Sequence, residues 1–468
     1  MMIRLLLAIA AVIAEIGCPV AASAQTAGAG AAALALEGCA SDLKYLNQIT
    51  GWQVRWPQEL ARLASAPKTR RAAALEDWRG AAAALSQDRA ALRASQAGAA
   101  PAPVVLRVLA QMEALAASPL APGLREPAWR DLLDEELRPA IRTYGRFLRN
   151  EYLPRAPVGS GLANSPTGTD CFERAAKTWT SRTLSTSAIE AMGAELMSRY
   201  RRELADLADV DQSQLPALLA TLRDPDRYGD TSRDDIVRIS RSAIDRAAAA
   251  IPRWFDGPSP GPLKIEPIER SLEVSLPAGY FEPAQGAADA VYRINLSNPS
   301  GRRAMAEVIA FHEGLPGHAL AFDRAAGRGT FSSGFVEGWA IYAEHLADEM
   351  KLYSGIDDRI GKVAKHLWAA SRLIVEPGLH VRGWSRDSAI AFMRDNTALP
   401  LSEIEIEVDR YLAMPGQSLS YMVGYESIRR ARASSEQKAG AAFDLRAFHH
   451  TLLAAGPRPL DQLEREFE

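Results

Sequence analysis

The sequence contains few of the residues that would restrict it to a narrow class of protein. It has three cysteines and seven histidines among 468 residues, and aromatic residues make up 7% of it. The formal net charge is only −3, which argues against nucleic acid or an anionic membrane as the main partner. Beyond the N-terminus, no apolar run approaches the roughly 20 residues that a membrane-spanning helix needs. We therefore expect a globular protein without a transmembrane span or a nucleic-acid partner, whose oligomeric state the sequence leaves open.

The N-terminus has the pattern of a signal peptide over residues 1–24. A basic residue precedes the apolar run Leu5–Ile13, and small residues ending at Ala24 form a cleavage site. We expect cleavage near Ala24 and export, to the periplasm or outside the cell. A lipoprotein anchored through Cys18 is the weaker alternative, because Glu15 stands where such a signal has an apolar residue.

Cleavage leaves two cysteines, Cys39 and Cys171. An even pair in an oxidising compartment favours a disulfide. Two unpaired buried thiols are the equal alternative, because the sequence does not place the two Cα atoms within the roughly 4.4–6.8 Å that a disulfide requires.

Helical periodicity dominates the chain. From about Cys39 to Pro252, apolar residues recur at spacings of three and four, with many alanines between them. A run of glycine and proline at 257–262 interrupts this pattern and suggests a boundary between lobes. Short strands are predicted after it, and helices return at Gly301–Glu313 and from Val336 onward. The expected fold is mainly α, with a helical N-terminal lobe at 25–255 and a second lobe at 256–468 that opens with a small sheet; the strands are Lys264–Glu266, Glu273–Ser275 and Ala290–Leu296.

The richest chemical motif is His312–His318, followed by Glu337. Two imidazoles and one carboxylate suit Zn²⁺ and leave its fourth position open for water. Glu313, beside the first ligand, is the expected general base. The 18 residues between His318 and Glu337 resemble the interval in gluzincin peptidases, whose third ligand is a glutamate on a second helix. Glu344 lies two helical turns beyond Glu337, where it could orient a ligand histidine.

The six-residue spacing of the histidines requires a distortion. On a straight helix, their side chains would point about 120° apart, and Pro316 cannot continue a helix through this point. The chain must therefore break or bulge at Gly314–Gly317. Either a bulge absorbs two residues, or a new helix starts at Pro316 with His318 in its first turn. A buried histidine pair at a helix–turn junction, without metal, is the alternative to a metal site.

Four strings in the second lobe together resemble a known family, the bacterial domain-of-unknown-function 885 family, grouped with gluzincin-like zinc metallopeptidases. The similarity is strong over about residues 256–468 and weak over 25–120. Two departures are Ala319, where a second histidine is common, and Glu376, where aspartate is usual. The matching strings are Phe311–His318, Glu337–Glu344, Arg372–His380 with Gly383–Ser385, and Arg410–Tyr411 with Pro415–Tyr421.

The resemblance implies a helical single-chain fold with a central cleft and a gluzincin-like catalytic lobe. It also implies that His380 and Tyr421 stabilise the oxyanion, and that Arg410 or Gln417 binds substrate. The strand Ala290–Leu296 lies where gluzincins have an edge strand that pairs with peptides; a purely structural strand is the equal alternative.

These observations predict an exported zinc peptidase that hydrolyses peptide bonds through a metal-activated water with Glu313 as base. Its preference for either end of the peptide stays open. The alternatives are a zinc amidohydrolase acting on non-peptide amides or cell-wall fragments, and a non-catalytic binding protein. The other histidines are expected on the surface or in helix packing, with His345 a weaker candidate beside the metal ligands; they are His345, His366, His449 and His450.

Overall fold

The computed structural model describes residues 34–39, 41–44, 46–95, 99–158, 161–270, 273, 276–284 and 289–468. The predicted signal peptide, with Ala24 and Cys18, lies outside these residues. The chain forms two compact units, whose described residues lie within Ala40–Val158 for the first and within Gly30–Cys39 and Gly159–Glu468 for the second.

This division differs from the predicted boundary at residue 255. The helices that follow residue 158 pack on the C-terminal half of the chain: α10 packs on α17, and α12 packs on α14. The glycine and proline run at 257–262 is therefore a loop inside the second unit. Residues 159–255, which were predicted to belong to the N-terminal lobe, belong with the metal motif.

The first unit is a set of amphipathic helices. Helix α6 buries Val104, Val108 and Met112 and packs on α3 and α8. A π-helical segment, Asp131–Leu137, leads into α8. The helices are α3 (Trp52–Ala64), α4 (Lys68–Trp78), α5 (Ala81–Ala94), α6 (Ala102–Ala117), α7 (Pro127–Arg130) and α8 (Arg138–Phe147).

The second unit begins with four helices, which precede its sheet. Helix α12 begins at Arg233, where the Ser232 side chain accepts a hydrogen bond from the Asp235 N–H and so caps the first turn. These helices are α9 (Gly168–Thr180), α10 (Thr186–Ala208), α11 (Leu215–Arg223) and α12 (Arg233–Trp254).

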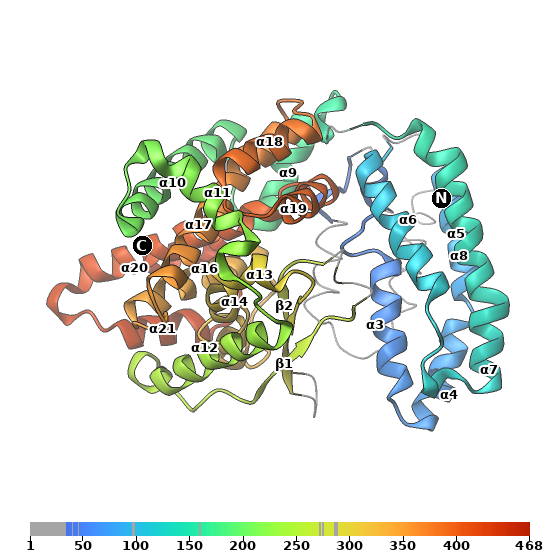
Figure 1. The fold of residues 1–468 in the computed structure, drawn as a ribbon, viewed down its shortest axis with the longest axis horizontal. Helices are drawn as coiled ribbons and strands as arrows, with labels where there is room; N and C mark the ends of the chain where they lie inside the picture. Colours follow the sequence, from blue (N-terminus) through green and yellow to red (C-terminus); the bar gives the residue numbers. More distant parts are fainter. Residues whose placement is uncertain are drawn as a thin grey trace. The chain divides into compact units, whose positions relative to one another are not determined.

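The remaining helices of the second unit follow the sheet in the chain, and three of them, α14, α15 and α16, carry the metal motif (Figure 1). They are α13 (Pro299–Arg302), α14 (Ala306–Glu313), α15 (His318–Ala325), α16 (Ser333–Glu349), α17 (Ile356–His380), α18 (Arg386–Asn396), α19 (Leu401–Ala413), α20 (Ser420–Ala439), α21 (Leu445–Ala454) and α22 (Leu460–Phe467).

Glycines allow α16 and α20 to cross closely. A Cβ atom at Gly338 would lie 2.3 Å from the carbonyl carbon of Gly424, and one at Gly424 would lie 1.8 Å from the Gly334 oxygen. No side chain fits at this crossing, so the two backbones touch. The crossing fixes Glu337 on α16 and Tyr421 on α20 within the same small region.

The sheet has three strands in the order β1-β3-β2, with β1 at Leu263–Pro267, β2 at Gly279–Glu282 and β3 at Ala290–Ile294. Strand β3 pairs in parallel with β1 and antiparallel with β2. Of the two alternatives for Ala290–Leu296, the edge strand is therefore excluded and the structural strand holds, because β3 has a neighbour on each side. The sequence pattern missed β2, and the predicted strand Glu273–Ser275 lies mostly outside the described residues.

The structure confirms a mainly α fold with a small sheet that precedes the metal motif (Figure 1). Among the helices of the described residues, none has the length and apolar character needed to cross a membrane. The central cleft stays a prediction.

Candidate metal centre

The turn at Gly314–Gly317 resolves the irregular histidine spacing. Helix α14 ends at Glu313, and α15 begins at His318. The structure shows a new helix with His318 in its first turn, as in the second predicted arrangement, but this helix begins at His318 and not at Pro316. The turn folds back so tightly that a Cβ at Gly317 would lie 2.0 Å from the His312 oxygen. Only glycine fits there, and this close approach brings the two histidines together.

Trp339 holds this turn in place. Its indole Nε1–H donates to the Pro316 oxygen at 3.1 Å and the Gly317 oxygen at 3.2 Å, and its side chain is fully buried. Trp339 lies on α16, two residues after Glu337. The same helix therefore fixes the turn and supplies the third expected ligand.

The three predicted ligands converge. His312 Nε2 lies 3.4 Å and His318 Nε2 lies 3.7 Å from Glu337 Oε2. One potential ligand atom from each residue lies within 4.8 Å of the others. Tetrahedral bonds of about 2.1 Å to zinc separate ligand atoms by about 3.4 Å. The set therefore fits a zinc ion with little rearrangement.

An unpartnered oxygen supports the same fit. Glu337 Oε2 is buried and has no hydrogen-bond partner among the described residues. His312 Nε2, at 3.4 Å, is too distant for a well-formed hydrogen bond. A buried carboxylate oxygen without a partner is costly unless a cation or a donor meets it. The donor set and this oxygen both suit a divalent metal.

The charges of the ligands depend on their surroundings. Burial and Lys365 act to lower the pKa of His312, but Glu337 and Glu344 outweigh them and raise it to about 9. Burial and the neighbouring His312 lower the pKa of His318 to about 3. Burial acts to raise the pKa of Glu337, but the two histidines bring it down to about 2. These directions favour a positive charge on His312 beside a negative charge on Glu337.

Glu344 is the partner of His312 on the side away from the ligand atoms. Its Oε1 lies 2.6 Å from His312 Nδ1 and accepts from Lys365 Nζ at 2.5 Å, and its Oε2 lies 2.8 Å from His366 Nε2. Burial acts to raise the pKa of Glu344, but these three partners hold it well below its usual value. A charged Glu344 orients the His312 ring, which is the role that the sequence predicts.

Lys365 and His366 are contacts that the sequence reasoning missed. Both lie on α17 and are buried. Lys365 had been assigned no role, and His366 had been placed on the surface or in helix packing. One feature of the sequence could have revealed them: Lys365 and His366 are adjacent basic residues inside an otherwise apolar helical stretch. Basic side chains that are buried there need a partner.

Replacing Glu344 by Gln should weaken metal binding about 10- to 100-fold, because an amide is a poorer acceptor and leaves Lys365 without its counter-charge. Competition with a chromogenic chelator would measure the dissociation constant. Glu426→Gln is the matched control, since Glu426 is a buried carboxylate that pairs with Arg199 and Arg429 instead. Equal affinities in the Glu344 variant and the wild type would exclude this orienting role.

Glu313 lies beside the ligands. Its Oε2 is 3.9 Å from His318 Nε2, and the side chain is mostly buried, with 10% exposed. Burial, together with the nearby Glu337, raises its pKa to about 7. A carboxylate with this pKa can accept and return a proton near neutral pH.

Tyr421 lies over the first ligand. Its ring stacks on the His312 ring at 6.0 Å with an angle of 16° between the planes. Burial and the charge of Glu337 raise its pKa to about 12. The hydroxyl therefore keeps its proton at neutral pH and is a hydrogen-bond donor.

The structure does not support the oxyanion role predicted for His380. Its Nδ1 accepts from the Leu162 N–H, and its Nε2 donates to the Tyr411 oxygen, both at 3.1 Å. The ring is fully buried and stacks on Phe172 at 5.5 Å, and burial lowers its pKa to about 4. Both ring nitrogens form hydrogen bonds with main-chain atoms, so no N–H is left to donate to a substrate. The sequence pattern could not reveal this, because these partners lie on distant segments.

The two predicted substrate-binding residues contact each other. Arg410 Nη1 donates to Gln417 Oε1 at 3.1 Å, and Arg410 Nη2 donates to Glu407 Oε2 at 3.0 Å. Arg410 acts electrostatically on Glu337 and on Tyr421. The structure therefore places Arg410 beside the ligands, together with Arg372 and Glu407, which the sequence reasoning did not assign to substrate binding.

Two other predictions concern residues away from the ligands. Cys39 and Cys171 form a disulfide, with their Cα atoms 5.9 Å apart. His345 stacks between His366 and Tyr425 at 4.2 and 4.7 Å, so it packs behind Glu344 and not on a ligand. His449 is buried and His450 is exposed.

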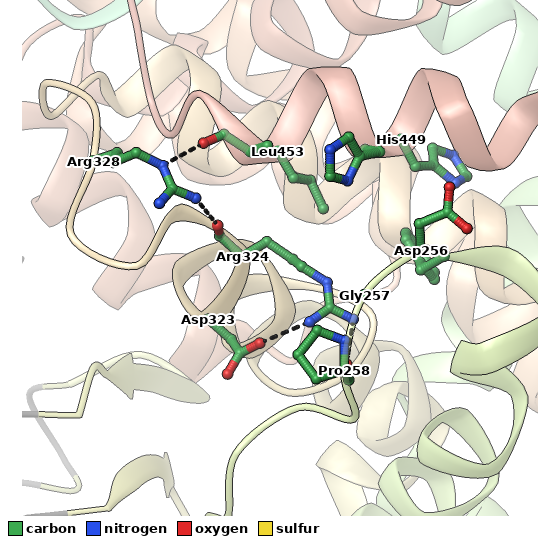
Figure 2. Close-up of a pocket in the computed structure, with 11 residues that line it drawn as sticks. Asp256, Gly257, Pro258, Asp323, Arg324, Arg328, His449 and Leu453 are labelled. Carbon is green, nitrogen blue, oxygen red and sulfur yellow. Dashed lines mark hydrogen bonds and ion pairs between the residues drawn. The ribbon is translucent and has the colours of Figure 1, made fainter.

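A separate cavity of about 320 Å³ lies between the end of α12, α15 and α21. Figure 2 shows Arg324 on its wall, bonded to the Asp323 carboxylate at 3.1 Å and to the Pro258 oxygen at 2.7 Å. None of the predicted ligands, catalytic residues or substrate-binding residues lines it. Its lining is Phe255, Asp256, Gly257, Pro258, Asp323, Arg324, Arg328, His449, His450, Leu453 and Ala454.

Solved structures share the fold. Two are described as putative lipoproteins, the second of unknown function. The first, from Colwellia psychrerythraea, has a TM-score of 0.78 and 22% identity, covering 90% of this chain and 80% of that one. The second, from Shewanella oneidensis, has a TM-score of 0.67 and 17% identity, covering 91% and 83%.

No curated protein matches the chain. A family described as "Bacterial protein of unknown function (DUF885)" matches residues 19–467. This match includes both compact units and every expected metal ligand. The chain therefore belongs to the DUF885 family of bacterial proteins.

Proposed function

We propose that the protein is an exported, zinc-dependent peptidase. The observation that carries this proposal is the meeting of His312 Nε2, His318 Nε2 and the unpartnered Glu337 Oε2 within 4.8 Å, with Glu313 and Tyr421 beside them. Three ligands of this kind leave one coordination position for water or substrate, which is the arrangement of a catalytic zinc site.

The side chains divide the work of hydrolysis. A bound zinc ion would supply Lewis acidity and lower the pKa of a water toward about 7. Glu313 accepts a proton from that water and returns it to the departing amine. The Tyr421 hydroxyl donates a hydrogen bond to the oxygen that gains negative charge. Glu344 keeps the His312 ring oriented throughout.

The most direct test is a peptide-library digest followed by mass spectrometry, with and without a chelator. We expect cleavage that stops with the chelator and returns with zinc. Cleavage of simple amides but of no peptide would favour the amidohydrolase alternative. Less than about a tenth of an equivalent of zinc, even after reconstitution of a site built to hold one ion, would favour a non-catalytic binding protein.

Tyr421→Phe should lower kcat by about 10²- to 10³-fold, as the loss of one oxyanion donor does elsewhere. Because the hydroxyl acts mainly in the transition state, KM should change little. Steady-state kinetics on one peptide would separate the two constants. Tyr425→Phe is the matched control, since Tyr425 lies on the same helix and stacks on His345. A change in KM alone would move Tyr421 to substrate binding.

The disulfide and the structural neighbours support export. Disulfides persist mainly in oxidising compartments, and the two neighbours carry lipoprotein descriptions. We propose cleavage near Ala24, with lipidation at Cys18 as the competing arrangement. The mass of the mature protein would distinguish them: a free N-terminus at Gln25 supports the first, and a lipid-modified Cys18 supports the second.

A further inference from the structure

Two arginines share one carboxylate beside the metal centre. Arg372 Nη2 and Arg410 Nη2 each donate to Glu407 Oε2 at 3.0 Å. The Tyr411 hydroxyl donates to the same oxygen at 3.0 Å. One carboxylate balances one guanidinium, so this arginine pair, Arg372 and Arg410, keeps one positive charge in excess of Glu407.

The two members of the pair differ in what they can still bind. Arg372 is 3% exposed, and its guanidinium lies between the Trp368 and Tyr421 rings at 4.3 and 4.4 Å. Arg410 is 9% exposed, and its Nε is buried without a partner among the described residues. Arg372 therefore holds Glu407 in place, and Arg410 retains a donor for a further acceptor.

Tyr421 connects Arg410 to the ligands. The Arg410 Cζ atom lies 5.9 Å from the centre of the Tyr421 ring, which lies 6.0 Å from the His312 ring. The path is at most about 12 Å long, which three to four residues of extended chain at about 3.4 Å each would cover. A group held by Arg410 thus lies within three to four residues of chain from the point where hydrolysis occurs.

The chemistry of Arg410 selects an anion. Its Nη1 and Nη2 already donate to Gln417 and Glu407. Its Nε–H, which is unpartnered in the described part of the chain, and its positive charge suit a carboxylate oxygen. An ammonium group would need a carboxylate that has no other partner. The carboxylates on which Arg410 acts do not offer one, because Glu407 is held by the arginine pair and Glu337 is an expected metal ligand. The third, Glu376, accepts hydrogen bonds from Gly416 and Ser418.

We propose that Arg410 binds the C-terminal carboxylate of a peptide substrate, so that the protein removes residues from the carboxyl end of peptides. This inference rests on the proposed peptidase function and adds the end preference. Hydrolysis would consume one water, break a peptide bond within about four residues of the C-terminus and release a free amino acid or a short peptide.

Matched peptides test the proposal in the wild-type protein. One sequence would be prepared with a free C-terminal carboxylate, with a C-terminal amide and with an acetylated N-terminus. We expect kcat/KM for the free acid to exceed that for the amide about 10- to 100-fold, the range for a charge-assisted hydrogen bond. Acetylation should have no effect. Mass spectrometry should find products shortened at the carboxyl end.

Two variants test whether Arg410 causes the preference for a free C-terminal carboxylate. Arg410→Gln should bring the ratio of kcat/KM for the acid and the amide close to one. Arg386→Gln is the matched control and should leave that ratio unchanged. Arg386 begins α18 and pairs with Asp409, the residue before Arg410 on α19. The wild-type comparison stands even if the Arg410 variant fails to fold.

Failure of this inference differs from failure of the proposed function. Equal cleavage of the acid and the amide, or loss of cleavage on acetylation, would overturn the inference alone. Absence of cleavage of every peptide by zinc-loaded protein would overturn the peptidase function and the inference with it.

Discussion

Glu313→Gln should remove most turnover while the metal stays bound. The amide has nearly the same shape as the carboxylate but cannot accept a proton, and Glu313 is not one of the three residues whose ligand atoms converge. General-base catalysis contributes about 10²- to 10⁴-fold, so kcat should fall by a factor in that range. Zinc content and kcat, measured on the same preparation, would check both halves of the expectation.

The control for this experiment is Glu307→Gln on the same helix. Glu307 is a buried carboxylate that bonds to Arg246 and Ser354. Its replacement costs stability but should leave kcat close to the wild-type value. If Glu313→Gln kept near wild-type turnover, another group would have to act as the base.

The pH profile is a second check on the same residue. The ionised form of Glu313 is the base, so kcat/KM of the wild type should fall as the pH drops through the Glu313 pKa. Burial raises that pKa to about 7 without a metal, and the positive charge of a bound zinc ion lowers it. The acid limb should therefore lie at or below pH 7 and be absent from the residual activity of Glu313→Gln.

Removal of the Cys39–Cys171 disulfide should lower the free energy of unfolding more than any other substitution proposed for this protein. The bond closes a loop across a sequence separation of 132 residues. In the chain-entropy account, a loop of this length restricts the unfolded state by about 5 kcal/mol at 25 °C, and strain in the native state can only reduce the benefit. The double substitution Cys39→Ala with Cys171→Ala avoids leaving a free thiol.

Urea unfolding of the oxidised wild type and the double variant would measure this loss. Reduction should shift the wild-type midpoint by a similar amount and leave the midpoint of the variant unchanged. Identical midpoints for wild type and variant would mean that the unfolded chain gains little freedom when the bond is absent. Arg174 donates to both sulfur atoms at 3.1 Å, so its guanidinium loses two acceptors in the variant.

The sequence predicted the helical class and singled out three side chains that the structure brings together, because both inferences depend on local patterns. Apolar spacing identifies helices, and the residues His312, His318 and Glu337 are a known donor set for zinc. The tight turn also had a local signal, since Pro316 cannot continue a helix and the glycines beside it favour a turn.

The parts that were missed depend on contacts between distant segments. His380 received the wrong role because its partners, Leu162 and the Tyr411 carbonyl, come from other parts of the chain. The division near residue 158 follows from the packing of α10 on α17. The position of β3 inside the sheet required strand β2, whose four residues carry too little periodicity to stand out.

Helix α16 carries Glu337, Trp339 and Glu344 within two turns. One helix therefore supplies an expected metal ligand, the anchor of the turn and the partner of His312. Trp339 holds the turn between the histidines, and Glu337 meets their Nε2 atoms. A metal on these ligands would work as a reversible cross-link between α14, α15 and α16. Because the ion would bind the folded protein and not the unfolded chain, the folded state would gain stability with the logarithm of the ratio of the free-metal concentration to the dissociation constant.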